Sequence, residues 1–374
     1  MTSTLGSRRA AEVLGRPLTI GDLTVANRIV MAPMTRQLSP GGVPGENVAR
    51  YYARRAAADV GLIITEGTFV GHPSAGMSDS IPRLWGEDAL NGWRRVVAEV
   101  HAVGGRIIPQ LWHVGVTRTE GRGPVPEAPA VGPSGIDLDG TPKGQALGAR
   151  DIDDVVRAFA DAAATALELG FDGVELHGAH GYLIDEFLWG RTNRRTDGYG
   201  GDIASRVRFA AEIVEAVRAA VTPTFPIFFR LSQWKSGQYD ARIAETPAEL
   251  DQILTPLARA GVDAFHASTR RYWLPEFDGS DLNLAGWAKK LSGKPTVTVG
   301  SVGLDAEFVG PGGRATESAV TGIEQLLERA EREEFDLVAV GRALIADPEW
   351  ARKTLEGGAG EVTPYSVEQL RGLN

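Results

Sequence analysis

Two imidazoles and a phenol lie close together in the segment His177-Gly-Ala-His180-Gly-Tyr182. The segment 171–176 directly before it predicts a buried strand entered from a helix that ends at Gly170. Imidazole N–H groups bind an electron-rich oxygen, and a phenol can donate a proton beside it. We therefore predict catalytic roles for His177, His180 and Tyr182 at the C-terminal end of a strand.

These residues have two other interpretations. His177 and His180 could form a metal pair, but His72, His101, His113 and His266 offer no third ligand at a convincing spacing, so no metal site is predicted. Tyr182 could also be an amphipathic residue at the edge of a loop.

The elements that position these residues follow from eight short apolar runs. They lie at 28–32, 61–65, 106–111, 173–177, 227–231, 264–267, 296–299 and 337–340. Helical patterns separate them, with start signals at Asp151, at the capping box 246–249 and at a second capping box, 321–324. Strict alternation over eight strands favours a closed (β/α)8 TIM barrel over an open doubly wound sheet. We expect one domain over residues 1–374, with a flexible N-terminal segment at 1–16 and a hairpin at 18–25 that closes the barrel floor.

The predicted strand ends suggest a phosphorylated cofactor. Glycines let backbone N–H groups approach phosphate oxygens, and an arginine adds a charged bond, which suits the ends of the seventh and eighth strands. Gln110 and Arg230 offer polar groups to a planar heterocycle. Flavin mononucleotide (FMN), held noncovalently, fits both ends. The predicted cofactor-binding residues are Ala32, Pro33, Met34, Thr35, Gly67, Gln110, Arg230, Gly300, Ser301, Gly303, Gly341 and Arg342.

Arg230 could also be a buried ion-pair partner of Glu66 or Glu175. This role is compatible with contact to a flavin. Two long connections, 113–150 and 268–295, are expected to form binding loops. Trp112 and Trp273 are predicted to line the substrate pocket together with the two histidines and Tyr182.

Composition limits the class of protein. The 374 residues include no cysteine, so disulfides, thiolate-bound iron–sulfur clusters and thiol nucleophiles are excluded. A formal net charge of −9 argues against a general nucleic-acid or membrane surface. No signal-peptide pattern or long apolar run is present, and we expect a soluble cytoplasmic protein acting on a small molecule. A homo-oligomer stays open.

Residues from 17 to about 355 resemble the Old Yellow Enzyme family of FMN-dependent NADH:flavin oxidoreductases, or ene-reductases. The resemblance rests on several motifs that occur in the family's order. They are MAPMTR at 31–36, PQLWHVG at 109–115, ELHGAHGYLIDEFL at 175–188, TNRRTDGYGG at 192–201, FRLS at 229–232 and VAVGRALIADPEW at 338–350.

The resemblance implies a ping-pong reaction in which NADH or NADPH reduces the flavin and an α,β-unsaturated carbonyl compound reoxidises it. His177 and His180 would bind the carbonyl oxygen, and Tyr182 would protonate the α carbon. Thr35 would bond the flavin O4 atom and Gln110 its pyrimidine edge. Arg230 would stabilise the negative charge at N1 and O2 of the reduced flavin.

Two alternatives stay open at this stage. Residues 187–193 and 266–273 resemble relatives that demethylate N-methyl amino acids. In that reaction the flavin takes a hydride from an amine instead of giving one to an alkene. A cation-selective aromatic cage in the pocket would support this activity. The second alternative is a flavin-free phosphate-binding barrel that acts as a lyase or isomerase.

Overall fold

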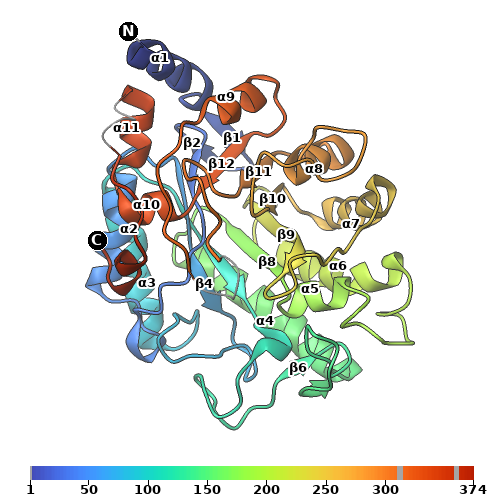
Figure 1. Ribbon diagram of the computed structural model, residues 1–374. Helices are drawn as coiled ribbons and strands as arrows, with labels where there is room; N and C mark the ends of the chain where they lie inside the picture. The colour runs from blue at the N-terminus through green and yellow to red at the C-terminus, as the bar shows by residue number, and fades with distance from the viewer. Residues whose placement is uncertain (1, 310–314, 358–361) are drawn as a thin grey trace.

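The computed structural model describes residues 2–309, 315–357 and 362–374. Eight parallel strands close into a barrel in the order β3, β4, β5, β8, β9, β10, β11, β12, with β12 pairing back to β3. Their bounds are Ile29–Met31, Leu62–Phe69, Ile107–Trp112, Val174–His180, Ile227–Lys235, Ala264–Ser268, Thr296–Val299 and Leu337–Val340. All eight predicted strands are present, and the predicted (β/α)8 barrel is confirmed (Figure 1).

Helices surround the barrel because each connection between parallel strands returns along its outside (Figure 1). Most of them bury an apolar face in the core that surrounds the strands. The α-helices after the first are α2 (Glu46–Ala56), α3 (Glu87–Ala102), α4 (Ala149–Glu168), α5 (Leu183–Leu188), α6 (Ile203–Ala220), α7 (Pro247–Ala260), α8 (Leu284–Ser292), α9 (Glu324–Glu331), α10 (Arg342–Ala346) and α11 (Trp350–Glu356). Short 3-10 turns lie at Pro40–Gly42, Gly115–Thr117 and Val367–Arg371.

The start signals of the helices have mixed outcomes. Thr246 caps α7 as predicted, because its side chain accepts the backbone N–H of Glu249. The second predicted capping box is wrong. Helix α9 begins at Glu324, since the backbone N–H of Thr321 donates to the carbonyl oxygen of Gly303 and keeps this stretch extended.

The N-terminal segment, expected to be flexible over 1–16, contains a helix. Residues Thr2–Leu14 form helix α1, which packs against α9 and α11 at one end of the molecule (Figure 1). Ala10 and Leu14 are buried there, and Arg9 forms an ion pair with Glu331. The apolar side chains in the second half of this segment thus pack against α9 and α11. The composition of the segment alone does not predict this contact.

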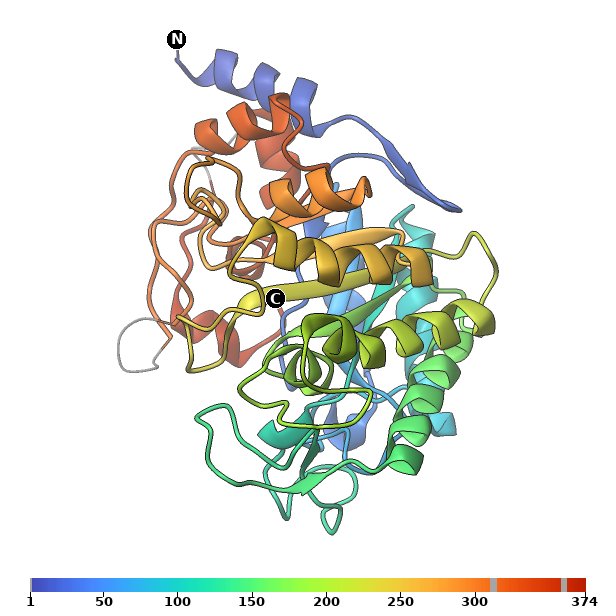
Figure 2. The same ribbon diagram turned by 90° about the vertical axis from the view of Figure 1, so that its right-hand side faces the viewer.

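The predicted hairpin is formed by β1 (Leu18–Ile20) and β2 (Leu23–Val25), and Figure 2 shows it in blue directly after α1. Ile20, Leu23 and Val25 belong to the same apolar cluster as the inward-facing side chains of the barrel strands. The backbone N–H of Asp22 donates to the carbonyl oxygen of Thr224, just before β9 begins. The hairpin therefore closes the N-terminal end of the barrel, and the opposite end is left for chemistry.

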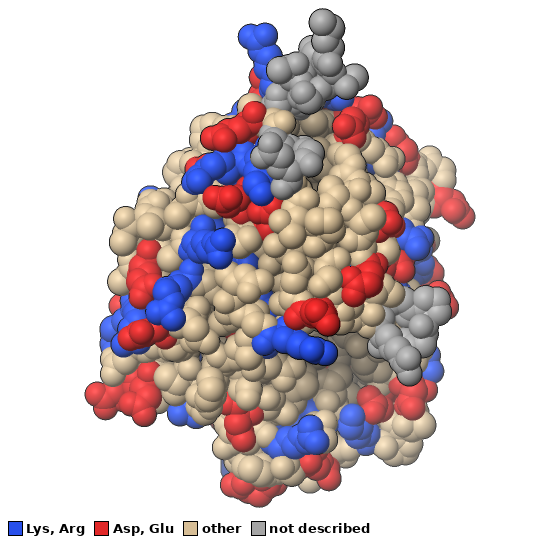
Figure 3. All heavy atoms as spheres, turned by 60° about the vertical axis from the view of Figure 1, so that its left-hand side comes forward, with Lys and Arg blue, Asp and Glu red and all other residues tan. Residues whose placement is uncertain are grey.

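Charges are mixed over the surface. On the face in Figure 3, Lys and Arg alternate with Asp and Glu, without a broad area of one sign. Among the described residues, no helix is both long enough and apolar enough to cross a membrane.

Candidate active site

A cavity of about 420 Å³ opens at the C-terminal ends of the barrel strands. This volume lies within the range of about 300–1,000 Å³ that small-molecule sites occupy. Residues that follow β3, β8, β9, β10, β11 and β12 line it, so six strands contribute to one site. The predicted site residues among them are Ala32, Pro33, Met34, Thr35, His180, Tyr182, Arg230, Gly300, Ser301, Gly341 and Arg342.

Two further predicted residues, His177 and Trp112, lie directly behind the residues that line the cavity. The rings of His177 and Tyr182 have centroids 4.9 Å apart, and Trp112 packs edge-on to Tyr182 at 4.8 Å. His177 and His180 lie 5.0 Å apart in a T-shaped arrangement. The three predicted catalytic side chains and Trp112 thus form one aromatic cluster at the cavity.

Three predicted residues lie elsewhere. A Cβ on Gly67 would meet the indole of Trp112, so Gly67 serves close packing beneath that ring. Gly303 faces Trp350 rather than the cavity. Trp273 packs against Tyr272, and its carbonyl oxygen accepts from Arg329, so it does not line the cavity.

The sequence reasoning missed the aromatic wall of the cavity. Trp234 stacks on His180 with centroids 4.3 Å apart, and Tyr239 follows Trp234 at 6.0 Å. Both residues line the cavity. Strand β9 was expected to end at 231 but runs to Lys235, and this extension brings Trp234 to the site.

The predicted long loops contribute unequally. Ser268, Thr269 and Arg270 line the cavity, whereas residues 113–148 do not. The loop after β11 contributes Leu304, Glu307 and Phe308, which the sequence reasoning did not single out.

The backbone at the end of β8 is shaped to present His180. This residue has a φ of +67°, and the pairing with β9 shifts its register between Gly178 and His180. A positive φ is uncommon for a residue with a side chain and needs support from its surroundings. The support includes a hydrogen bond from the His180 N–H to Ser232 Oγ, at 2.9 Å.

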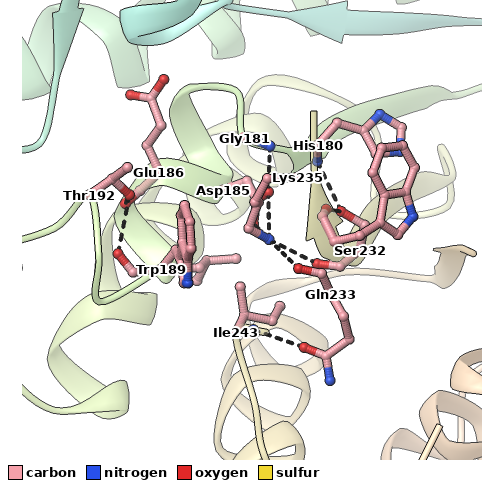
Figure 4. Close-up of polar contacts among 12 residues, drawn as sticks. His180, Gly181, Asp185, Glu186, Trp189, Thr192, Ser232, Gln233, Lys235 and Ile243 are labelled. Carbon is pink, nitrogen blue, oxygen red and sulfur yellow. Dashed lines mark hydrogen bonds and ion pairs between the residues drawn. The ribbon is translucent and has the colours of Figure 1, made fainter. Parts of the chain in front are cut away.

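A buried ion pair fixes the turn that follows. Lys235 Nζ lies 2.9 Å from the carboxylate of Asp185, and neither side chain is exposed. Lys235 Nζ also donates to the carbonyl oxygens of Ser232 and Gln233, while Asp185 accepts the N–H of Gly181 (Figure 4). The pair therefore ties the β9 extension to the turn between His180 and Tyr182.

Burial sets the protonation of the three catalytic candidates. Desolvation, together with the charge of Arg230, holds the pKa of both His177 and His180 well below the ordinary value of 6.5. Desolvation also raises the pKa of Tyr182 to about 12. At neutral pH the site thus contains two neutral imidazoles and a protonated phenol.

Arg230 lies between the histidines of the neighbouring strands, in register with His177 on β8 and His266 on β10. Its Nη2 donates to Ser268 Oγ, and its buried Nε has no partner among the described residues. Neither predicted ion-pair partner bonds Arg230 in the part of the chain that the structure describes. Burial lowers the pKa of Arg230, and the charge of Glu175 opposes this shift, whereas Glu66 accepts the backbone N–H groups of Arg36 and Gln37.

Gln110 does not line the cavity and is oriented by a buried network. Its Nε2 donates to Glu175 Oε1 at 2.8 Å, and Glu175 Oε2 lies 2.7 Å from His266 Nδ1. Because a carboxylate only accepts hydrogen bonds, the amino end of the Gln110 amide must face Glu175. The carbonyl oxygen of that amide is left for another partner.

At the predicted phosphate end, Gly300 has a φ of +141°, and a Cβ there would lie 2.7 Å from the carbonyl oxygen of Thr269. Only glycine fits this position. The Arg342 guanidinium donates to Ser318 Oγ and Ser301 Oγ, at 2.6 and 3.4 Å, so it also holds the loop that follows β11.

The C-terminal segment completes one side of the cavity through Leu370. Arg36 Nη2 donates to the carbonyl oxygens of Gln369, Leu370 and Gly372. Arg55, which is fully buried, donates from Nη1 to the carbonyl oxygen of the last residue of the sequence. Two arginines thus hold this segment against the barrel through backbone oxygens.

A parallel barrel with arginines, neutral histidines and a glycine-lined wall at its C-terminal end is typical of a barrel enzyme that binds a phosphorylated ligand. Comparison with known proteins narrows this class. Residues 14–360 match the model of the NADH:flavin oxidoreductase / NADH oxidase family. The chain belongs to this family.

Individual relatives agree. The chain is 33% identical over 395 residues to flavin oxidoreductase hxnT of Emericella nidulans, covering 98% of this chain and 96% of the relative. It is 36% identical over 356 residues to an NADH oxidase of Thermoanaerobacter brockii, covering 92% of this chain but only 50% of that protein. The chain thus spans about half the length of that relative. The solved structure of an Old Yellow Enzyme homologue from Zymomonas mobilis superposes with a TM-score of 0.77 at 27% identity, covering 96% of each chain.

The predicted Old Yellow Enzyme membership is therefore confirmed, and with it FMN as the cofactor and a reduced nicotinamide as the hydride donor. The cavity residues fit FMN. The buried Arg230 Nε and His177 Nδ1 have no hydrogen-bond partner among the residues that the structure describes, and Gly300 brings bare backbone to the cavity. Arg230 and Gln110 would hold the flavin ring, while Gly300, Ser301, Gly341 and Arg342 would hold the phosphate. Among the described residues no cluster of three or more His, Cys, Asp or Glu could bind a metal ion.

Proposed function

We propose that the protein uses NADH or NADPH to reduce the activated C=C bond of α,β-unsaturated carbonyl compounds by a ping-pong reaction. The observation that carries this proposal is the meeting of His177, His180 and Tyr182 beside Arg230 at one cavity. Bound FMN would supply the hydride transfers, first from the nicotinamide and then to the alkene.

The two histidines bind the substrate. Because both imidazoles are neutral, each has one N–H to donate to a carbonyl oxygen and lacks the second, acidic proton of an imidazolium. Hydrogen bonds at this oxygen draw electron density from the alkene and stabilise the negative charge that develops on hydride addition.

Tyr182 completes the addition. Its pKa of about 12 keeps the phenol protonated at working pH, so that it can donate a proton to the α carbon. Trp112 and His177 pack against its ring and fix the direction of the hydroxyl group. Tyr182 is therefore the proton donor of the proposed reaction.

The amine-demethylating alternative is less well supported by the cavity. Arg230 and Arg270 line it, and both repel a protonated amine. One aromatic face of the cavity, that of Tyr239, already lies under the Arg270 guanidinium at 3.8 Å. The flavin-free alternative conflicts with the family to which the chain belongs.

The decisive experiment is anaerobic. The purified FMN-loaded protein is reduced by NADH or NADPH and then mixed in turn with cyclohexenone, maleimide and N-methylproline, while flavin absorbance is followed. We expect rapid reoxidation by the two activated alkenes, with saturated products. If neither alkene reoxidises the flavin and N-methylproline reduces the oxidised protein, the proposed direction is wrong.

A further inference from the structure

Ser268, the last residue of β10, connects the substrate-binding pair to the buried cation. Its Oγ lies 2.7 Å from His180 Nε2 and 3.2 Å from Arg230 Nη2. The Ser268 side chain is 2% exposed, so water contributes little to its hydrogen bonding. Three strands, β8, β9 and β10, thus meet at one hydroxyl group.

The hydrogen atoms at this junction can be assigned. A guanidinium only donates, so the Ser268 oxygen accepts from Arg230. The buried Ser268 hydrogen needs an acceptor, because an unsatisfied buried donor costs about 1–3 kcal/mol. The neighbouring atom able to accept it is His180 Nε2, since the imidazole is neutral. The proton of His180 must then reside on Nδ1.

We propose that Ser268 is a positioning residue that fixes the tautomer of His180 and thereby makes Nδ1–H the donor to the substrate oxygen. This inference rests on the proposed function for the identity of the ligand. It assigns to Ser268 a role that depends on hydrogen-bond direction, which a residue that merely fills space would not have.

The surroundings hold Ser268 and His180 in the required relation. The indole of Trp234 stacks on His180, and its Nε1 donates to the carbonyl oxygen of Ser268 at 3.0 Å. Ser232 Oγ accepts the N–H of His180 and donates to the carbonyl oxygen of Trp234 (Figure 4 shows the His180–Ser232 bond). Trp234 therefore fixes one face of the His180 ring, and Ser232 fixes the His180 backbone. The hydrogen bond with Ser268 then determines which ring nitrogen carries the proton.

The first test reads the tautomer directly. Long-range 1H–15N correlation spectra of uniformly labelled FMN-loaded protein are recorded at pH 7.5, with the His180 signals assigned by their loss in His180→Asn. We expect the Nδ1–H pattern in the wild-type protein and a mixed or Nε2–H pattern in Ser268→Ala. An Nε2–H tautomer in the wild-type protein overturns the proposal even if the variant fails to fold.

The second test measures ligand binding. Para-chlorophenol is titrated into oxidised FMN-loaded protein, and its charge-transfer band is recorded. Ser268→Ala should raise the dissociation constant roughly three- to tenfold, the effect of one hydrogen bond, and Ser268→Thr should restore most of the affinity because it keeps the hydroxyl group. Thr296→Val removes a buried hydroxyl at the other end of the neighbouring strand β11 and serves as the matched control.

The outcomes separate the two proposals. An unchanged tautomer and phenol affinity in Ser268→Ala contradict the role of Ser268, even if enones are reduced normally. A tautomer change without any enone turnover in the wild-type protein contradicts the proposed function and leaves the assignment of the His180 proton intact.

Discussion

At the scale of single residues, the proposed reaction assigns the binding of an oxygen and the delivery of a proton to different side chains. His177 and His180 are neutral donors, whereas Tyr182 keeps its proton up to a pKa of about 12. The same buried arginine influences all three, since the charge of Arg230 adds to the desolvation that lowers the histidine pKa values and opposes the desolvation that raises the pKa of Tyr182. Changes at these residues should therefore affect different steps.

Tyr182→Phe keeps the ring and removes only the acidic hydrogen. Flavin reduction by NADH or NADPH should be nearly unchanged, whereas reoxidation by cyclohexenone should slow by at least about tenfold, because a positioned acid contributes roughly 10²–10⁴-fold. Stopped-flow measurement of each half-reaction checks this, with Tyr199→Phe, whose hydroxyl bonds Glu212 outside the site, as the control. Equal slowing of both half-reactions would indicate that Tyr182 shapes the cavity for both ligands and is not the proton donor.

His180→Ala removes one of the two donors to the ligand oxygen. Phenol binding should weaken by roughly 1.5–3 kcal/mol if the bound oxygen is anionic, the range for hydrogen bonds to charged groups. Asparagine at this position should recover part of the loss, because an amide N–H can donate from a similar place. Phenol titrations of the three proteins measure this. Chelator-sensitive turnover, with phenol affinity equal in all three, would instead indicate a metal site.

The affinity for phenol should also be insensitive to protein protonation near neutral pH. Burial holds the pKa of both histidines well below 6.5, so neither gains a proton between pH 6 and 8. After correction for ionisation of the phenol itself, its dissociation constant should stay flat across this range. A change with a midpoint near pH 6.5 would show that a histidine titrates as if exposed.

Arg230→Ala removes the cation proposed to lie beside the flavin ring. FMN should dissociate more readily, and the bound flavin should become harder to reduce, because negative charge on the reduced ring loses its partner. Equilibrium dialysis and a potential measured against reference dyes report the two effects separately. Unchanged values for both would contradict the predicted contact.

Much of the residue-level site could be predicted because its chemistry is concentrated in contiguous sequence. His177, His180 and Tyr182 belong to one strand end, and Arg230 interrupts an apolar strand. Trp234 and Ser268 could not be found in this way. Their roles depend on the length of β9 and on which strand ends become neighbours when the barrel closes. A local sequence pattern predicts neither of these two properties.

At the scale of elements, the strand order was predictable because each strand is a short apolar run bounded by turns or helix signals. The departures occur where tertiary contacts override a local signal. Backbone pairing of Thr321 with Gly303 delays the start of α9, and the apolar side chains of α1 are buried against α9 and α11. Local patterns predicted which elements exist better than where they begin and end.

The Asp185–Lys235 pair provides a test at this scale. Lys235→Met should destabilise the fold by roughly 3–5 kcal/mol, because it leaves the buried Asp185 carboxylate without its cation. Combining it with Asp185→Leu should recover a large part of this loss, since an apolar pair avoids burying charge. Urea unfolding at pH 7.5 measures both. Arg332→Met breaks a surface pair with Asp281 and should change stability little.

At the scale of the whole molecule, a buried carboxyl should make stability depend on pH. Desolvation raises the pKa of Glu66 from 4.5 to about 7. Between these values the folded state keeps a proton that the unfolded state releases, so the contribution of Glu66 to stability falls as pH rises from about 4.5 to 7 and is constant above that.

Glu66→Gln removes this titration and keeps an oxygen that can accept from Arg36 and Gln37. The variant should lose up to about 3 kcal/mol of the pH dependence of unfolding between pH 4.5 and 7.5, from 1.36 kcal/mol for each pKa unit. Urea unfolding at several pH values measures the slope, and Glu87→Gln on the exposed surface of α3 is the control. Parallel curves for wild type and Glu66→Gln would contradict the raised pKa.

The C-terminal segment has a consequence for how the cavity can change in evolution. Arg36 and Arg55 hold this segment through carbonyl oxygens alone, so they fix the path of the backbone and place no demand on its side chains. Leu370 faces the cavity from that path. Mutation can therefore alter the size and polarity of this wall without disturbing its anchorage, which makes position 370 a suitable place for natural variation or directed evolution to adapt the range of substrates.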